Sequence, residues 1–292
     1  MLEFSATMAT FTAPTFTAPD GTALGYRVTG SGDPLLVIPG GPMRSGEYLG
    51  DLGGLAAHRT LHVLDLRGSG ASGSVADPAS WRCDRQVPDL EAFRAHLGLD
   101  RADVLGHSAG ASLAILHAVA HPDRVASLTL VAPSLLSVGI VPNLQCLREA
   151  LVARDGLPAV PAAVEKAVEK VAAGTSTEAD WAELTPLYYG RWDENARAHA
   201  QASERQRNAE AARAYYAEGV FDPEATRRGL AEVTAPVLLL AGELDPAPRP
   251  AMAAEAAALF PEAQAAVLPG AAHFPWLDDP AAFVRVAGEF LR

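Results

Sequence analysis

Gly106-His107-Ser108-Ala109-Gly110 is the stretch that decides the fold, because it places one serine in a sharp turn between a strand and a helix. The residues before it, Ala102–Leu105, are short and strand-like. The residues after it, Ala111–Val119, favour a helix that must end before Pro122. The two glycines remove the Cβ atoms that would collide in such a turn. The pattern therefore predicts that Ser108 is an exposed nucleophile.

A nucleophilic serine needs a base to take its proton and an acid to orient that base. In a doubly wound sheet these follow in the order serine, acid, histidine. Asp245 follows the apolar run Pro236–Gly242, and His273 follows a second run, Ala265–Pro269. Such runs predict strands buried on both faces of a parallel sheet. Because the carboxyl ends of these strands meet at one edge, we expect Ser108, Asp245 and His273 to converge there.

Two alternatives to this assignment stay open in the sequence. Glu243 lies two residues before Asp245 and is the rival acid, and an Asp before Pro246 also commonly begins a turn. Among the eight histidines, His273 is the one that follows the last predicted strand on a loop. We expect the side chain of His107 to point away from the reacting side.

The tetrahedral intermediate of acyl transfer needs two preorganised N–H donors for its oxyanion. The backbone N–H of Ala109, directly after the serine, is the first candidate. The second should come from the loop Pro39–Pro42, which follows the predicted strand Leu35–Ile38. Glycine allows the backbone to approach a substrate closely, and Gly41 is therefore the second predicted donor.

These features make the chain resemble the α/β-hydrolase superfamily, and within it the cap-bearing branch of proline iminopeptidases and esterases. Four features carry the likeness, in order along the chain: Pro39–Pro42, Asp65–Ser72, the Ser108 turn, and the paired segments of Asp245 and His273. The resemblance implies that Asp65 and Arg67 fix a loop near the site.

The likeness to iminopeptidases is incomplete at two places. Their oxyanion loop reads His-Gly-Gly-Pro-Gly, whereas this chain has Pro39 and Met43 at the two ends of that pattern. Their elbow carries a tryptophan after the serine, and this chain has Ala109. These departures argue against aminopeptidase activity and leave the predicted serine-hydrolase chemistry intact.

The order of predicted elements indicates an α/β fold with a mostly parallel, doubly wound sheet and an inserted helical cap. Residues 20–134 and 231–292 are predicted to form the α/β-hydrolase core, and residues 1–19 an N-terminal tail or first strand. The alternation breaks over 135–230, where helical periodicity predicts the cap, for example over Ala159–Ala172 and Asp193–Glu218.

A cap inserted at this point should cover the serine and exclude water. Since pockets are lined mainly by apolar and aromatic groups, aromatic residues of the cap are the predicted substrate wall. Tyr216 and Phe221 are candidates too, and the residues assigned to this wall are Trp181, Tyr188, Tyr189, Trp192 and Tyr215.

The net charge of −12 argues against nucleic acid or an anionic membrane as a partner. Neither a signal peptide nor a transmembrane run is evident, which makes cytoplasmic the expected location. Cys83 and Cys146 form no metal or redox motif, and the predicted mechanism requires no cofactor or metal. The expected partner is a small-molecule substrate, and the oligomeric state stays open.

The sequence therefore predicts a serine hydrolase that cleaves an ester or amide bond of a small, largely apolar substrate through an acyl-enzyme. Two alternatives stay open: an aminopeptidase of the proline iminopeptidase type, and a lyase or ligand-binding member of the same fold, since fold does not fix function.

Overall fold

The computed structural model describes residues 13–73, 75, 77–154 and 160–292. Its strands are β1 (Thr15–Thr17), β2 (Ala23–Gly30), β3 (Pro34–Ile38), β4 (Thr60–Leu64), β5 (Ala102–His107), β6 (Val125–Val131), β7 (Val237–Gly242) and β8 (Ala263–Leu268). Its α-helices are α1 (Val87–His96), α2 (Ala109–Ala120), α3 (Leu144–Val152), α4 (Ala162–Ala172), α5 (Glu178–Glu183), α6 (Glu194–Gln206), α7 (Ala209–Tyr215), α8 (Pro223–Leu230), α9 (Pro250–Ala257), α10 (Pro275–Asp278) and α11 (Pro280–Phe290).

The strands of the described residues form one sheet in the order β1-β2-β4-β3-β5-β6-β7-β8. The pairs β1–β2 and β2–β4 are antiparallel, and every other neighbouring pair is parallel. This confirms the predicted α/β fold with a mostly parallel sheet. Of the predicted N-terminal segment 1–19, residues 1–12 lie outside the described residues, and Thr15–Thr17 forms β1.

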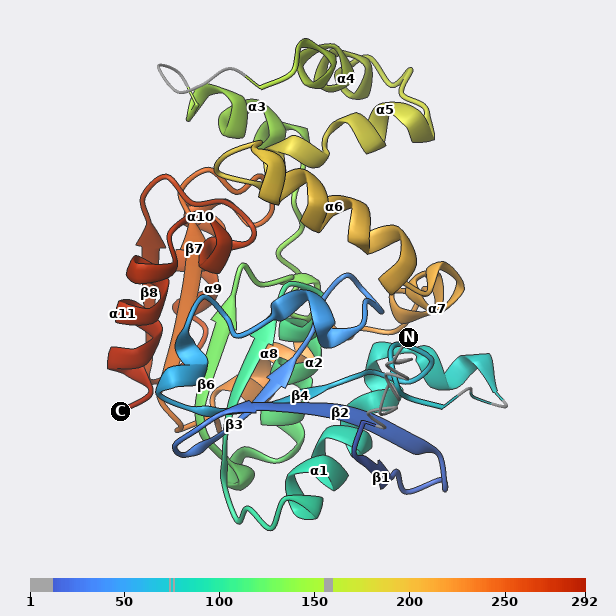
Figure 1. The fold of residues 1–292 in the computed structure, drawn as a ribbon, viewed down its shortest axis with the longest axis vertical. Helices are drawn as coiled ribbons and strands as arrows, with labels where there is room; N and C mark the ends of the chain where they lie inside the picture. Colours follow the sequence, from blue (N-terminus) through green and yellow to red (C-terminus); the bar gives the residue numbers. More distant parts are fainter. Residues whose placement is uncertain (1–12, 74, 76, 155–159) are drawn as a thin grey trace, which may run out of the picture.

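Helices cover both faces of the sheet, and the alternation of side chains along each strand divides the core in two. In β3, Leu36 and Ile38 belong to the cluster under α1, α2 and α9, whereas Leu35 and Val37 face α10 and α11. The same alternation recurs along β7, where all six residues are buried. Figure 1 shows α11 along one side of the sheet and α2 with α8 along the other.

Strand β8 differs from the sequence prediction, because it is not buried on both faces. It pairs only with β7 and ends the sheet, and most of its residues are at least partly exposed. Val267, for example, is 47% exposed. An apolar run rich in alanine does not distinguish an edge strand from a central one, because alanine is tolerated in both settings.

The helices from α3 to α8 lie between β6 and β7 in the sequence. Figure 1 shows α3, α4 and α5 as a layer beyond the carboxyl edge of the sheet, with α6 crossing between this layer and the core. A small cluster of buried apolar residues, centred on Val164, Ala167 and Leu187, holds that layer together. Helix α8 instead packs against α2, and Leu230 belongs to the main core.

The predicted helical stretch 193–218 is broken in the middle. Helix α6 ends at Gln206 and α7 begins at Ala209, with Asn208 capping α7 through its side chain. At the break, Arg207 forms an antiparallel bridge with Arg44, in the loop after β3. Backbone hydrogen bonds from Ser45 N–H to Gln206 O (2.8 Å) and from Asn208 N–H to Met43 O (3.0 Å) complete this pairing. The break therefore ties the inserted helices to the loop that carries Gly41.

Candidate active site

Ser108 lies at the turn between β5 and α2 with φ 52° and ψ −120°. A positive φ is unfavourable for a residue with a Cβ atom, so the sharp turn holds the Ser108 backbone in a strained conformation. A Cβ at Gly110 would lie 2.4 Å from the Ile38 carbonyl oxygen, and a Cβ at Gly106 would lie 2.8 Å from Ala111 Cα. Neither position has room for a side chain. The two glycines that frame the serine are therefore required by close backbone packing, as the sequence indicates.

Ser108, His273 and Asp245 meet at the carboxyl edge of the sheet in a continuous chain of hydrogen bonds. The Ser108 Oγ lies 2.9 Å from His273 Nε2, and His273 Nδ1 lies 2.8 Å from Asp245 Oδ2. Since an ionised carboxylate only accepts, Nδ1 carries the imidazole proton and Nε2 is free to accept from the serine hydroxyl. Asp245 is fully buried, and its Oδ1 accepts the N–H of Ala247 at 2.9 Å.

The rival acid Glu243 occupies a different position. Its exposed carboxylate accepts the N–H of Gly270 at 2.8 Å, in the turn that leads to the His273 loop. The Arg249 side chain donates to the carbonyl oxygens of Glu243 (3.0 Å) and Asp245 (2.9 Å). Glu243 and Arg249 therefore support the two loops. Of the two acids, only Asp245 contacts His273 through its carboxylate.

The loop after β3 brings Gly40 and Gly41 against the serine. A Cβ at Gly40 would lie 2.8 Å from Ser108 Cβ, and Gly41 has a φ of +117°, a conformation that favours glycine. Among the described residues, the backbone N–H groups of Gly41 and Ala109 have no hydrogen-bond acceptor. Two unpaired N–H donors beside the serine are what an oxyanion site requires.

Sequence reasoning missed a buried hydrogen-bond relay under these loops. The N–H of Gly40 donates to the Tyr48 hydroxyl at 2.7 Å, and that hydroxyl donates to His107 Nδ1 at 2.6 Å. His107 Nε2–H in turn donates to the carbonyl oxygen of His273 at 2.9 Å. The prediction that His107 points away from the reacting side is wrong in this respect, because its ring joins the oxyanion loop to the histidine loop.

Burial keeps the His107 and Tyr48 side chains of this relay uncharged. Desolvation lowers the pKa of His107 well below its ordinary value, and the nearby His273 and Arg44 lower it further. Burial also raises the pKa of the Tyr48 hydroxyl above its usual range. A neutral imidazole has one donor and one acceptor, which matches its two contacts. No local motif marks Tyr48, so only the three-dimensional packing identifies it.

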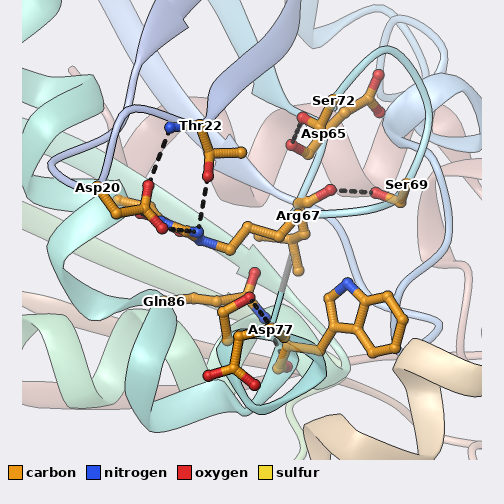
Figure 2. Close-up of polar contacts among 12 residues, drawn as sticks. Asp20, Thr22, Asp65, Arg67, Ser69, Ser72, Asp77 and Gln86 are labelled. Atoms are coloured by element: carbon orange, nitrogen blue, oxygen red, sulfur yellow. Dashed lines mark hydrogen bonds and ion pairs between the residues drawn. The ribbon is translucent and has the colours of Figure 1, made fainter. Parts of the chain in front are cut away.

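Asp65 and Arg67 lie in the segment after β4 and make polar contacts with neighbouring loops. The fully buried carboxylate of Asp65 accepts the N–H groups of Gly46 (2.7 Å) and Ala71 (2.8 Å). Gly46 begins the short 3-10 helix Gly46–Leu49 that carries Tyr48. Figure 2 shows Arg67 reaching Asp20 and Thr22, near the start of β2.

A cavity of about 880 Å³ opens above Ser108 and His273. Of the five aromatic residues predicted to form its wall, the structure places Tyr188 and Tyr189 there, and Tyr216 and Phe274 also line it. The Tyr188 ring stands edge-on to the His273 imidazole with centroids 5.4 Å apart, and the Tyr188 carbonyl accepts the His273 N–H at 3.1 Å.

The other three predicted aromatic residues do not line the cavity. Trp181 lies on α5 with 53% of its surface exposed. Trp192 packs beside the Tyr189 ring, with centroids 5.3 Å apart, outside the cavity lining. Tyr215 is fully buried on the core side of α7, where its hydroxyl donates to the Ala109 carbonyl at 3.0 Å. Aromatic content does not reveal which side of a helix faces the site.

Four charged residues also line the cavity: Arg44, Glu178, Glu204 and Arg207. Arg44 is 4% exposed, whereas Glu178 and Glu204 are exposed on α5 and α6. The sequence did not single out Arg44, because nothing in the residues around it signals that the cavity would open beside it.

In the part of the chain that the structure describes, no group of three or more His, Cys, Asp or Glu side chains is arranged to hold a metal ion. In the same residues, no helix combines the length and the apolar character needed to cross a bilayer.

The family model for the alpha/beta hydrolase fold matches residues 33–280, and the chain belongs to that family. A proline iminopeptidase of Heyndrickxia coagulans is 27% identical over 90% of this chain and 91% of its own length.

Solved structures show similarity over nearly the whole chain. A proline iminopeptidase of Mycobacterium smegmatis has a TM-score of 0.73 and 26% identity, covering 95% of this chain and 97% of that one. An esterase of a Rhodococcus species has a TM-score of 0.68 and 26% identity, covering 96% and 98%. The chain is thus similar to both peptidases and esterases of the same fold.

Proposed function

We propose that this protein is a serine hydrolase that cleaves an ester bond of a small, largely apolar substrate through an acyl-enzyme. The observation that carries the proposal is the unbroken chain from Ser108 Oγ through His273 to the buried Asp245, at 2.9 and 2.8 Å. A cavity large enough for a small ester opens directly above it.

The proposed reaction has two halves. His273 Nε2 takes the Ser108 proton as Oγ attacks the carbonyl carbon, and the resulting oxyanion is held by the N–H groups of Gly41 and Ala109. Collapse of this intermediate breaks the bond to the alcohol, which receives the proton from His273. Water then attacks the acyl-enzyme with His273 as base, and the acid product and free Ser108 are released. Asp245 holds the imidazole tautomer and stabilises the imidazolium.

An aminopeptidase of the proline iminopeptidase type is the second candidate. It is favoured by the similarity to iminopeptidases over most of the chain, and by Glu178 and Glu204 at the cavity, since a carboxylate suits a substrate amine. The esterase is preferred because these two carboxylates are exposed, whereas the buried charge at the cavity is the cation Arg44. A free amine beside a buried cation would be repelled.

The test compares p-nitrophenyl acetate, butyrate and octanoate with prolyl p-nitroanilide, using the wild type and Ser108→Ala. Loss of the nucleophile should reduce kcat by about 10⁴-fold or more, since the triad acts as a unit. Serine-dependent ester turnover supports the proposal, and turnover of the prolyl anilide alone supports the peptidase. Ligand binding without serine-dependent turnover of any of these compounds would contradict both and indicate a binding protein or a lyase.

A further inference from the structure

Arg44 is a buried cation at the cavity wall whose contacts include no carboxylate. Its Nε donates to Gln206 Oε1 at 2.9 Å and its Nη2 to the His199 carbonyl at 3.0 Å, both on α6. Nη1 has no partner among the described residues. The guanidinium carbon lies 4.3 Å from the centre of the Tyr48 ring. Two hydrogen bonds and the contact with the Tyr48 ring therefore hold the Arg44 side chain in place, and N–H groups of its guanidinium remain available to a ligand.

No carboxylate is paired with this charge: Glu178 and Glu204 line the same cavity but are exposed, and among the described residues neither forms an ion pair with Arg44. The nearby carboxylate of Glu47 is exposed and forms no ion pair with Arg44. Tyr48 and Tyr189 contribute hydroxyl groups whose pKa values are raised by burial, so both are neutral. Burial and the charge of Arg44 together lower the pKa of His199 to about 4, so that this ring is neutral as well.

A second arginine lies at the same cavity. Arg207 is an exposed residue that forms the backbone bridge with Arg44, and the only hydrogen bond of its side chain among the described residues is from Nε to the Pro42 carbonyl at 3.2 Å. The cost of burial falls on Arg44, which is 4% exposed and has no acidic partner although the chain as a whole is acidic, with a net charge of −12. A ligand that carries the missing negative charge would offset this cost.

We propose that Arg44, together with Arg207, binds a carboxylate carried by the substrate, so that the ester cleaved is an anionic one. The planar guanidinium with free N–H groups matches a carboxylate in geometry as well as charge. Arg44 lines the same cavity as Ser108 and packs on the ring of Tyr48, whose hydroxyl accepts the N–H of Gly40, so a carboxylate held by Arg44 would share the cavity with the scissile carbonyl. The inference rests on the proposed esterase function and narrows its substrate class.

Two anionic esters and their neutral counterparts test the proposal. Monomethyl glutarate places the carboxylate on the acyl side and is paired with methyl hexanoate. Acetoxyacetate places it on the alcohol side and is paired with isobutyl acetate. Wild-type kcat/KM, followed by pH-stat, should favour the anionic member of at least one pair by about 10- to 100-fold, the value of one or two charge-assisted hydrogen bonds.

Arg44→Gln and Arg207→Gln should lower this selectivity ratio, with the larger loss at Arg44. Arg205→Gln is the matched control, since Arg205 lies on α6, two residues before Arg207, but outside the cavity lining, and it should leave the ratio unchanged. If Arg44→Gln slows both members of a pair equally, Arg44 only supports the fold and the proposal is wrong. Using a ratio keeps the result independent of any general loss of activity.

Calorimetric titration of glutarate and acetate into the Ser108→Ala protein separates this inference from the esterase function. Binding of glutarate that weakens in added salt, and that is lost in the Ser108→Ala/Arg44→Gln protein, supports the carboxylate site even if no ester is hydrolysed. Hydrolysis of neutral esters with neither anionic preference nor carboxylate binding would overturn the inference and leave the esterase function standing. If Arg44→Gln fails to fold, the wild-type and Ser108→Ala measurements still decide whether the site prefers a carboxylate, and Arg207→Gln, at an exposed residue, tests the role of the arginines.

Discussion

The hydroxyl of Tyr48 connects the two loops on which the proposed chemistry depends. It accepts the N–H of Gly40 and donates to His107, whose other nitrogen contacts the His273 backbone. Both partners of the hydroxyl are buried, so neither has water as a substitute. Tyr48 therefore acts as a positioning residue, since it aligns the oxyanion loop with the histidine without touching the reacting atoms.

Tyr48→Phe should reduce kcat by about 10-fold with a smaller effect on KM, because misplacing a catalytic loop slows the chemical step. The unfolding free energy should fall by about 1–3 kcal/mol, since two buried polar groups lose their partner. The ring is kept, so the contact with Arg44 is preserved. Steady-state kinetics and urea unfolding provide the two readouts.

Tyr26→Phe is the control for this substitution. Tyr26 is also buried, and its hydroxyl contacts His96 Nε2 at 3.2 Å, outside the cavity lining. It should lose stability while kcat stays unchanged. If Tyr48→Phe behaves in the same way, the relay supports only the fold and has no part in aligning the site.

Residues that belong to a motif could be placed from sequence, whereas residues defined by packing could not. Ser108 and His273 follow from the turn and from the order of strands, and the structure brings them within 2.9 Å. Asp245 and Glu243 lie two positions apart, and only the path of the loop decides which one reaches the histidine. Arg44 contacts groups more than 150 residues away in the chain, so no local pattern reveals it.

At the scale of elements, Arg154 joins the inserted helices to the site. It follows α3, is 8% exposed, and donates to four backbone carbonyls. Two of these belong to Leu187 and Tyr189, on either side of Tyr188, and another to Leu244, next to Asp245. Burial lowers the pKa of Arg154 to about 10, which leaves the guanidinium charged at neutral pH.

Arg154→Met keeps the length of the side chain but removes all four hydrogen bonds. We expect kcat/KM to fall by about 10- to 100-fold, because Tyr188 and the Asp245 loop lose a common support. We also expect faster proteolysis within 144–192, since local opening becomes easier where anchoring contacts are lost. Kinetics and limited proteolysis measure the two effects.

Arg148→Met is the matched control, because Arg148 lies on α3, six residues before Arg154, with an exposed side chain. It should change neither quantity. An Arg154→Met protein with wild-type kinetics and an intact cleavage pattern would show that the remaining contacts of α3 anchor the inserted helices without Arg154.

The elements themselves were predicted well where periodicity is strong and poorly where long-range pairing intervenes. The strand ending before Ser108 and helix α2 occur as expected, since both are set by local sequence. The break at Arg207 was not foreseen, because a good helix-forming stretch there is interrupted by pairing with Arg44 and Ser45. Tertiary contacts override helix propensity at such points.

At the scale of the whole molecule, burial of neutral histidines links stability to pH. Desolvation lowers the pKa of His117 and of His199 to about 4, and that of His107 well below its ordinary value. His117 is fully buried on α2, where Glu91 lies 3.2 Å from its Nε2. Arg94 and His121 on the same side disfavour its protonated form. Between about pH 6.5 and pH 4, the unfolded chain binds protons at these histidines that the folded protein does not.

The unfolding free energy should therefore fall as pH is lowered from about 7.5 to 5.5, by about 1.4 kcal/mol for each histidine that stays neutral. The pKa of Glu91 is lowered to about 2, mainly by Arg94, so its own contribution is lost only at lower pH, below this window. Urea unfolding at the two pH values measures the fall.

His117→Gln should make this pH-dependent fall in unfolding free energy smaller by the contribution of one histidine, whatever the variant does to stability at neutral pH. His58→Gln, at an exposed histidine, should leave it unchanged. An equal fall in all three proteins would place the origin of the acid sensitivity elsewhere than in His117.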